Sequence, residues 1–222
     1  DVYLTGNPQI TFFKVVYRRH TNFSKECIKQ QFNSSTSFDS SVTCTLARNG
    51  DLVQEIYLKA VLTCTTDATT NTKLILNDVT NLIKTVEIEI GGQKIDKHYT
   101  QWLDIYNELF ETSHDYREVM NSANGTTGDK TVYIPLRFWF NRNPGLALPL
   151  IALQYHEVKV NIELGSATDL LGVTNSSVPT ASSAKACVTD STPVNGTTNL
   201  HVTLKSADLL VNYVYLDTDE RR

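Results

Sequence analysis

The sequence predicts an all-β fold, an antiparallel sandwich or jelly roll with one short helical insertion. The first reason is that apolar and polar residues alternate with a period of two along several segments. The clearest of these segments are Leu52–Cys64, Thr85–Ile90, Thr131–Phe140 and Glu157–Leu164. The second reason is that helical spacing recurs in one main stretch, and the third is that long polar loops separate the strands. Strands with one apolar face indicate antiparallel sheets packed over a shared core.

Turn and edge signals refine this prediction. Gly91 and Gly92 stand between two strand-like segments, and glycine tolerates the positive φ of a two-residue hairpin turn. Pro135 falls within a predicted strand, so that strand should lie at a sheet edge or contain a bulge. Gln9–Arg18 and Asp208–Leu216 carry apolar residues on both faces, which suits the inside of a sandwich or a contact with a neighbouring unit.

A helical insertion is predicted over about residues 100–120. Thr100 is a suitable N-cap, and a second, shorter turn would begin at Ser113. Apolar residues follow Thr100 at helical spacing, namely Trp102, Ile105, Tyr106, Leu109 and Phe110. The aromatic stripe of this helix could line a ligand pocket or a partner groove, but we expect it to pack the helix onto its own sheet.

The region of about residues 165–199 is the longest irregular stretch. Compact domains rarely contain structureless loops of this length, so we expect a short strand near Ala184–Val188. An interdomain linker is the alternative. We favour one domain over residues 1–222, because Leu200–Leu216 reads as a strand pair too small for a second domain and able to complete the sandwich. The sequence starts at Asp1 without a methionine and stops soon after a strand, so we expect a part of a longer protein.

Charge and composition argue against two classes of protein. The net charge is −4, and runs of basic residues do not exceed two, so we expect no direct binding of nucleic acid. The sequence contains neither a signal peptide nor an apolar run long enough to predict a membrane span. The cysteines are widely spaced, which predicts free, mostly buried thiols in a reducing compartment; they are Cys27, Cys44, Cys64 and Cys187.

Histidines form no zinc-site spacing in the sequence. They are His20, His98, His114, His156 and His201. His98 and His114 flank the predicted helix and could approach each other, whereas His156 and Glu157 would be strand neighbours on opposite faces. We expect solvated or capping histidines. The basic group Arg18-Arg19-His20 could bind an anion or another subunit, but a solvated strand end is the simpler reading.

Carboxylates form no convincing catalytic pattern. Glu87 and Glu89 share a strand face, as a glycosidase-like pair could, but we expect a solvent-facing strand edge beside Lys84 and Lys94. A nucleophile elbow, a phosphate-binding loop and a dinucleotide fingerprint are missing from the sequence. We therefore expect no catalytic residue, no cofactor and no metal.

Asparagine sequons recur along this Ser/Thr/Asn-rich chain. Three of them fall in predicted loops, where a glycan could project if the protein enters a glycosylating compartment. These candidate sites are Asn124, Asn175 and Asn195.

The opening LTGNPQITFFKVVYRRHTNF, from Leu4 to Phe23, is similar to the start of the major capsid proteins of nucleocytoplasmic large DNA viruses. Further motifs that resemble this family follow in order along the chain. The hairpin at residues 90–93, the helix at 101–106 and the stretch PLRFWFNRNPGLALPL from Pro135 to Leu150 also resemble family features. The closing YVYLDTDERR, residues 213–222, resembles the junction into the second module.

This resemblance implies a subunit of two eight-stranded jelly rolls, of which this chain would be the first. It further implies a structural, non-enzymatic role: a trimeric pseudo-hexagonal capsomer that tiles an icosahedral shell after assembly in the host cytoplasm. The implied partners are the second module, two further copies of the subunit, neighbouring capsomers and minor capsid proteins. Two other functions stay open, a carbohydrate- or receptor-binding jelly roll and, less favoured by the histidine spacing, a cupin-like metal enzyme.

Overall fold

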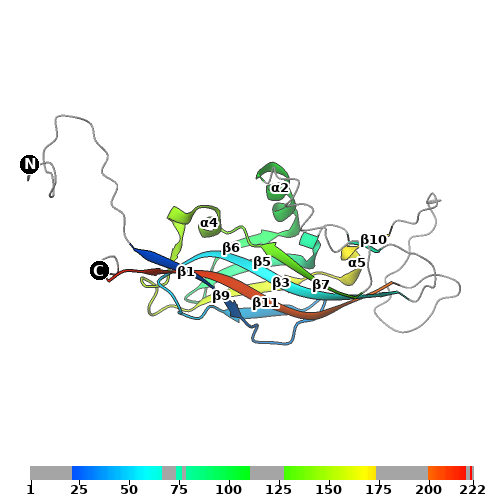
Figure 1. The fold of residues 1–222 in the computed structure, drawn as a ribbon, viewed down its shortest axis with the longest axis horizontal. Helices are drawn as coiled ribbons and strands as arrows, with labels where there is room; N and C mark the ends of the chain where they lie inside the picture. Colours follow the sequence, from blue (N-terminus) through cyan, green and yellow to red (C-terminus); the bar gives the residue numbers. More distant parts are fainter. Residues whose placement is uncertain are drawn as a thin grey trace, which may run out of the picture.

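The computed structural model describes residues 22–66, 74–76, 79–110, 128–173, 200–218 and 221. Within these residues, eight strands of five or more residues form two antiparallel sheets that face each other (Figure 1). The first sheet has the order β1 (Phe23–Gln30), β11 (Leu200–Leu216), β3 (Leu52–Thr66) and β7 (Gly128–Pro135). The second has the order β2 (Ser41–Thr45), β9 (Val158–Leu164), β5 (Ile83–Ile90) and β6 (Gln93–Tyr99).

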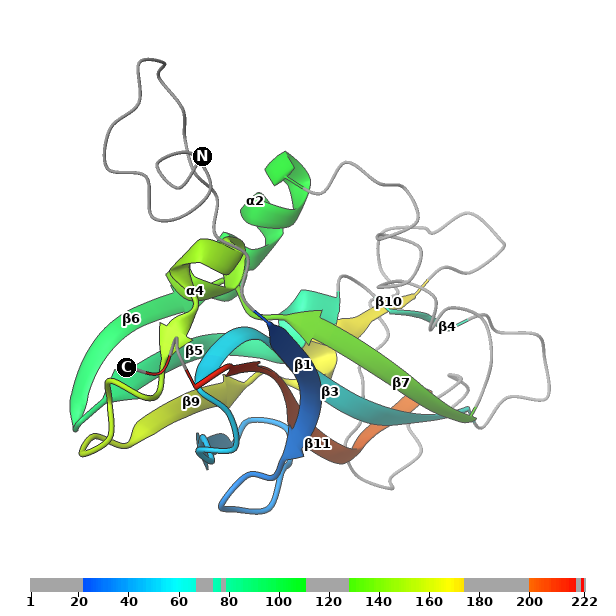
Figure 2. The ribbon, with the colours of Figure 1, turned by 60° about the vertical axis from the view of Figure 1, so that its left-hand side comes forward.

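Smaller elements lie around these sheets. The short strand β8 (Leu148–Pro149) pairs with β3, and β4 (Leu74–Leu76) pairs with β10 (Leu171–Val173). The helices are η1 (Val79–Leu82), α2 (Thr100–Phe110), α4 (Trp139–Arg142), η2 (Pro144–Leu146) and α5 (Ala167–Leu170). Helices α2 and α4 lie on the same side of the sandwich, beyond β6, in both ribbon views (Figure 2).

Strand pairing follows one rule across both sheets. The first long strand pairs with the last, β1 with β11, and the second pairs with the second-last, β2 with β9. The rule continues inward with β3 and β7 and then with β5 and β6. A chain that doubles into one long hairpin and then rolls up gives this order, and β11–β3 and β9–β5 pairing completes each sheet. The fold is therefore the eight-stranded jelly roll that was predicted.

The core lies between the two sheets, where period-two alternation turns one face of each strand inward. Along β9 buried and half-buried residues alternate without exception, and in β3 the inward residues are Ile56, Leu58, Ala60 and Leu62. Burying one such aliphatic side chain contributes about 1.5–3 kcal/mol, so the inner faces together supply the main stabilisation of the sandwich.

The hairpin and edge predictions are confirmed. Gly91 and Gly92 connect β5 to β6 with φ of +59° and +83°, the left-handed values of a primed turn. At Gly91, a Cβ would lie 2.7 Å from Nδ1 of His156, so a side chain there would both strain the backbone and force the His156 ring to move. Pro135 ends β7, which is the outer strand of its sheet among the described strands.

Two predicted strands have different bounds in the structure. The strand predicted over Thr131–Phe140 ends at Pro135, and the chain turns into α4 while Phe138 and Phe140 remain fully buried. Alternating apolar residues indicate which side chains are buried but not which backbone conformation buries them. Here the turn into α4 buries Phe138 and Phe140 as well as a strand would. Leu200–Leu216 is one 17-residue strand and not a strand pair. Register shifts between β11 and β3, at Leu204/Ser206 and Asn212/Tyr213, interrupt the regular pairing along this strand.

The irregular region predicted over residues 165–199 begins with regular structure. Ser166 caps α5: its hydroxyl accepts from the Asp169 backbone N–H and donates to the Asp169 carboxylate, which lies 2.8 Å away. Strand β10 follows directly and pairs with β4. The strand predicted at Ala184–Val188 lies outside the described residues, as do Gln9–Arg18 and the turn at Ser113.

Helix α2 occupies the first part of the predicted insertion but packs differently from expectation. Thr100 is its first residue, and the Thr100 hydroxyl donates to the carbonyl of Ile83, which ties the helix start to β5. Within α2 the buried residue is Leu103, whereas Phe110 is 61% exposed and Leu109 66% exposed. The prediction that the aromatic stripe packs the whole helix onto the sheet is therefore wrong for its last turn, because the helix points away from the sheets (Figure 1).

Candidate interaction surfaces

The outer face of the second sheet is a polar surface with a shallow depression of about 530 Å³. Strands β2, β9, β5 and β6 all contribute to it, because every second side chain of a strand points away from the core. Its polar residues are Ser41, Thr43, Thr85, Glu87, Glu89, Lys94, Lys97, Lys159, Asn161 and Glu163. We call this surface the polar face.

Glu87 is the centre of the polar face. Its carboxylate accepts from Lys94 at 2.8 Å and from Lys97 at 2.6 Å, and the residue is only 8% exposed. These two hydrogen bonds lower the pKa of Glu87 below its ordinary value. The expectation of a solvent-facing strand edge is therefore wrong, because β5 lies between β9 and β6 and the lysines of β6 reach across the carboxylate.

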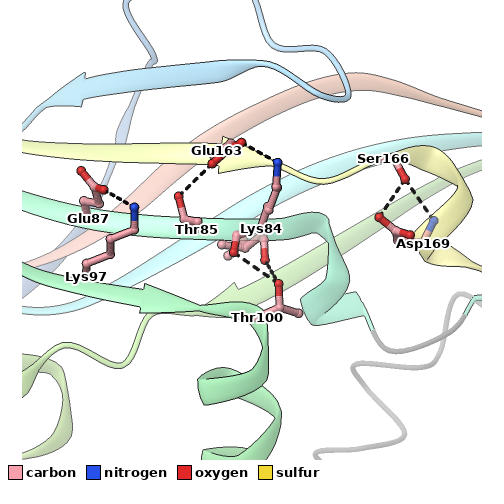
Figure 3. A network of polar contacts seen from close by, with 9 residues as sticks. Lys84, Thr85, Glu87, Lys97, Thr100, Glu163, Ser166 and Asp169 are labelled. Atoms are coloured by element: carbon pink, nitrogen blue, oxygen red, sulfur yellow. Dashed lines mark hydrogen bonds and ion pairs between the residues drawn. The ribbon is translucent and has the colours of Figure 1, made fainter.

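A second group of contacts joins β5 to β9 (Figure 3). Glu163 lies 2.8 Å from Nζ of Lys84 and accepts a hydrogen bond from the hydroxyl of Thr85 at 3.3 Å. The hydrogen bond from Lys84 lowers the pKa of Glu163, and the same bond raises the pKa of Lys84. Lys84 thus pairs with Glu163 and not with the glutamates of its own strand. Paired charges of both signs make the polar face suited to a hydrated contact and unsuited to an apolar one.

Aromatic rings fill the corner between β6, α2 and α4. His98 is 7% exposed, stacks on Phe138 with ring centroids 5.0 Å apart, and lies 5.9 Å from the ring of Trp102. Burial lowers the pKa of His98, although Asp96 lies 3.1 Å from its Nε2. A solvated or capping His98 was expected and is wrong, because its ring faces the core side of β6. Arg142 lies over the Trp102 ring, at 5.4 Å from the centroid.

A loop before β9 presents one fully exposed aromatic side chain. Tyr155 is 94% exposed. The loop around it is held by Arg48, whose guanidinium donates to the carbonyls of Leu153 at 2.8 Å, His156 at 2.9 Å and also Gln154. Because one side chain fixes three carbonyls of this loop, Tyr155 is an exposed tyrosine on an ordered support, a common feature of protein interfaces.

Several predicted site residues are not brought together by the described structure. His156 and Glu157 precede β9 and are not strand neighbours within it, because β9 starts at Val158. The described residues contain no group of three metal-ligating side chains. Candidate residues outside the described ranges are His20, His114, Cys187, Arg18, Arg19 and the sequon residues Asn124, Asn175 and Asn195.

The two cysteines whose side chains are described are free thiols in different settings. Cys44 is fully buried, and burial raises the pKa of its thiol to about 11. Cys27 lies on β1 and is exposed, which the expectation of mostly buried thiols did not foresee. Of the residues that matter on these surfaces, sequence reasoning missed Arg48 and Tyr155, because neither stands in a motif.

None of the helices in the described part of the chain has the length and apolar character to cross a membrane.

Jelly rolls of this kind serve as viral capsid, lectin and cupin domains, and comparison with known proteins selects the first of these classes. Residues 11–217 match the family described as major capsid protein N-terminus. The chain belongs to this family, as the sequence motifs indicated.

Relatives with known names agree. The chain is 49% identical over its whole length to the major capsid protein of Pyramimonas orientalis virus, of which it covers 52%. It is 43% identical to the major capsid protein of Paramecium bursaria Chlorella virus 1, again over the whole chain, and covers 46% of that protein. The chain thus spans about half the length of these curated relatives.

Solved structures show the same fold. A quasi-atomic model of the PBCV-1 virus capsid matches 95% of the chain with a TM-score of 0.67 at 38% identity, and 46% of that protein is covered. The Faustovirus major capsid protein matches 96% of the chain and 57% of its own length with a TM-score of 0.66. At 12% identity the second match speaks for the fold alone.

Proposed function

We propose that this chain is the first of two jelly-roll modules of a major capsid protein that builds the icosahedral shell of a large double-stranded DNA virus. The observation that carries the proposal is the coverage of its relatives. A relative at 49% identity aligns with the whole chain, yet the chain accounts for 52% of that relative. The matching family is described as the N-terminus of such proteins. A second module of similar size would follow in the complete subunit.

The proposed role is structural, in the virion and after assembly in the host cytoplasm. Three subunits would form a pseudo-hexagonal capsomer, which would contact neighbouring capsomers and minor capsid proteins. No catalytic residue, cofactor or direct contact with nucleic acid forms part of the proposal. The rolled-up hairpin supports it, because strand ladders on both sides of β11 and β9 make a stiff scaffold from which loops can contact other subunits.

The surfaces of the described residues divide into two kinds. The polar face offers paired charges for hydrated contacts between separately folded units. Tyr155 and the last turn of α2, with Leu109 and Phe110, expose large apolar side chains. Permanent interfaces resemble a core cut in half, so we place contacts between subunits or modules at these apolar side chains.

Quantitative mass spectrometry of purified virus particles tests this function. Tryptic peptides such as residues 85–94, which contain no sequon, should be among the most abundant in intact particles, because a shell protein is present in many copies. Mild detergent that removes lipid but leaves the shell intact should retain them. Trace amounts in purified particles, or loss of the peptides with the lipid fraction, would contradict the structural role.

A carbohydrate- or receptor-binding role is the second candidate, and one observation favours it. The polar depression lies beside Tyr99, which is 53% exposed and has Nζ of Lys97 at 5.3 Å from its ring centroid. Polar groups next to an exposed aromatic ring are typical of sugar sites. Glycan-array binding by the full-length protein that is lost in Tyr99→Ala would favour this role. If no glycan on the array binds, only the structural role remains supported.

Asn124, Asn175 and Asn195 stay proposed glycosylation sites. Their support is the sequon at each position and their place in stretches read from the sequence as loops. Peptide mapping of protein from virions would show hexose-containing masses at the modified asparagines, and unmodified peptides covering all three would refute the assignment.

A further inference from the structure

Asp51 immediately precedes β3 and connects three parts of the chain through its backbone. The Asp51 N–H donates to the carbonyl of Val214 at 3.0 Å, and the Asp51 carbonyl accepts from Ile151 at 3.2 Å. The first contact joins it to the end of β11, and the second to the segment that follows β8. The position of this residue is therefore fixed by the sandwich itself.

The Asp51 side chain continues this network beyond the last strand. Its Oδ2 accepts the backbone N–H of Leu216, the last residue of β11, at 2.8 Å. The same oxygen lies 3.1 Å from both Nε and Nη2 of Arg221. The Arg221 backbone N–H in turn donates to the carbonyl of Asp217 at 3.2 Å.

These contacts hold more of the chain than the sandwich requires. The β11 ladder ends at Leu216, and the described residues beyond it, 217, 218 and 221, pair with neither sheet. Nevertheless the Asp51 carboxylate, whose side chain is only 12% exposed, pairs with Arg221, five residues after Leu216. A poorly solvated carboxylate needs strong partners, and charge-assisted hydrogen bonds are roughly twice as strong as neutral ones. The direction in which the chain leaves the jelly roll is thus determined by Asp51.

We propose that Asp51 and Arg221 form a clamp that orients the module following Arg222 against this jelly roll. The inference rests on the proposed function, which supplies a second module. The partner of the clamp is the polypeptide after Arg222, because the clamp holds the residues that follow the last strand. These residues lie beside the start of β1, at the end of the sandwich where α4 lies (Figures 1 and 2). A flexible connection would let the second module sample many orientations, and a clamped exit removes most of that freedom before subunits assemble.

Hydrogen exchange of the full-length protein tests the clamp with two variants and a matched control. Asp51→Asn removes the charge that faces both Leu216 and Arg221, whereas Arg221→Gln leaves Asp51 and its contact with Leu216 intact. The control is Asp208→Asn. Asp208 also lies on β11, is 13% exposed at its side chain and pairs with Lys29 at 2.9 Å, a pair of nearly equal burial and geometry.

The two variants should differ in a defined way. In Asp51→Asn the amides of Leu216 and residue 221 should exchange about tenfold faster than in the wild type. In Arg221→Gln only residues beyond Leu216 should exchange faster, and the control should leave this segment unchanged. Trypsin should also cut after Arg221 faster in Asp51→Asn, because the Arg221 side chain is then released from Asp51 and can bind in the specificity pocket of the protease. Unchanged exchange and cleavage in both variants would overturn the clamp.

Small-angle scattering of the same variants separates the clamp from its proposed purpose. The clamped protein should have a narrower distribution of interatomic distances than either variant, and capsomer yield should fall in both. Faster exchange with unchanged scattering and capsomer yield would overturn the orienting role. If instead the polypeptide is missing from the virus shell, the proposed function fails while the exchange result on the clamp still stands.

Discussion

Tyr213 provides the sharpest test of how β11 is held in the sandwich. Its ring is fully buried, and its hydroxyl donates to the carbonyl of Ala47 at 2.6 Å while accepting from Gln30 at 3.4 Å. Tyr213→Phe keeps the ring packing and removes only the hydroxyl, which leaves the Ala47 carbonyl without this donor. A buried carbonyl left unsatisfied costs about 1–3 kcal/mol, and because Ala47 is only half-buried the cost should fall in the lower part of that range; the long contact with Gln30 adds little.

The expected loss is therefore about 1–2 kcal/mol for this sandwich. Native-state hydrogen exchange of β11 amides measures it in the full-length protein, because opening of this sandwich is followed apart from other regions. Exchange should quicken roughly 5- to 30-fold. Tyr215→Phe is the matched control: its hydroxyl donates to Glu26 at 3.2 Å at an exposed site, so its effect should stay below about 0.5 kcal/mol. Equal effects of the two substitutions would refute the reasoning.

Three further substitutions test other parts of the structure. Glu87→Gln should cost roughly 1 kcal/mol at neutral pH, since its lysine partners are largely exposed and solvent-screened. Because the pKa of Glu87 is lowered in the folded state, this stabilisation is present above the pKa of the unfolded state and is lost as the pH falls through the pKa of the folded state. The difference in unfolding free energy between Glu87→Gln and the wild type, measured with urea, should therefore vanish below about pH 4. A difference that persists at that pH would contradict the pairing. Tyr155→Ala should leave the melting temperature unchanged but lower capsomer yield, and unaltered assembly would remove Tyr155 from the interface. Leu58→Ala should cost about 2–5 kcal/mol by opening a cavity between the sheets, a loss that calorimetry of the full-length protein would detect and that a value under about 1 kcal/mol would contradict.

The strands with one polar face could be predicted from sequence, and the reason is geometric. In β9, and in β3 from Ile56 to Leu62, every second residue faces the core, so the buried residues, including Leu58 and Val160, can be predicted from the alternation alone. The hairpin at Gly91 could be predicted because glycine adopts a positive φ far more readily than other residues. These features depend on neighbours in the chain and not on distant contacts.

Features that depend on distant pairing could not be predicted in the same way. The two register shifts in β11 exist only against β3, so the strand looked like a pair when taken alone. Glu87 looked exposed because its burial depends on lysines from the neighbouring strand. Arg48 reaches carbonyls more than 100 residues away, and Asp51 reaches Arg221 across 170 residues. No local pattern contains such contacts.

Cryo-electron microscopy of purified virus particles tests the central claim most directly, at a resolution that traces the chain. The shell density should show this jelly roll, with sheet orders β1-β11-β3-β7 and β2-β9-β5-β6, as one half of a repeated subunit whose chain continues past Arg221 into a second sandwich. A shell built from a different polypeptide, or density in which β11 ends without a second sandwich beside it, would contradict the account.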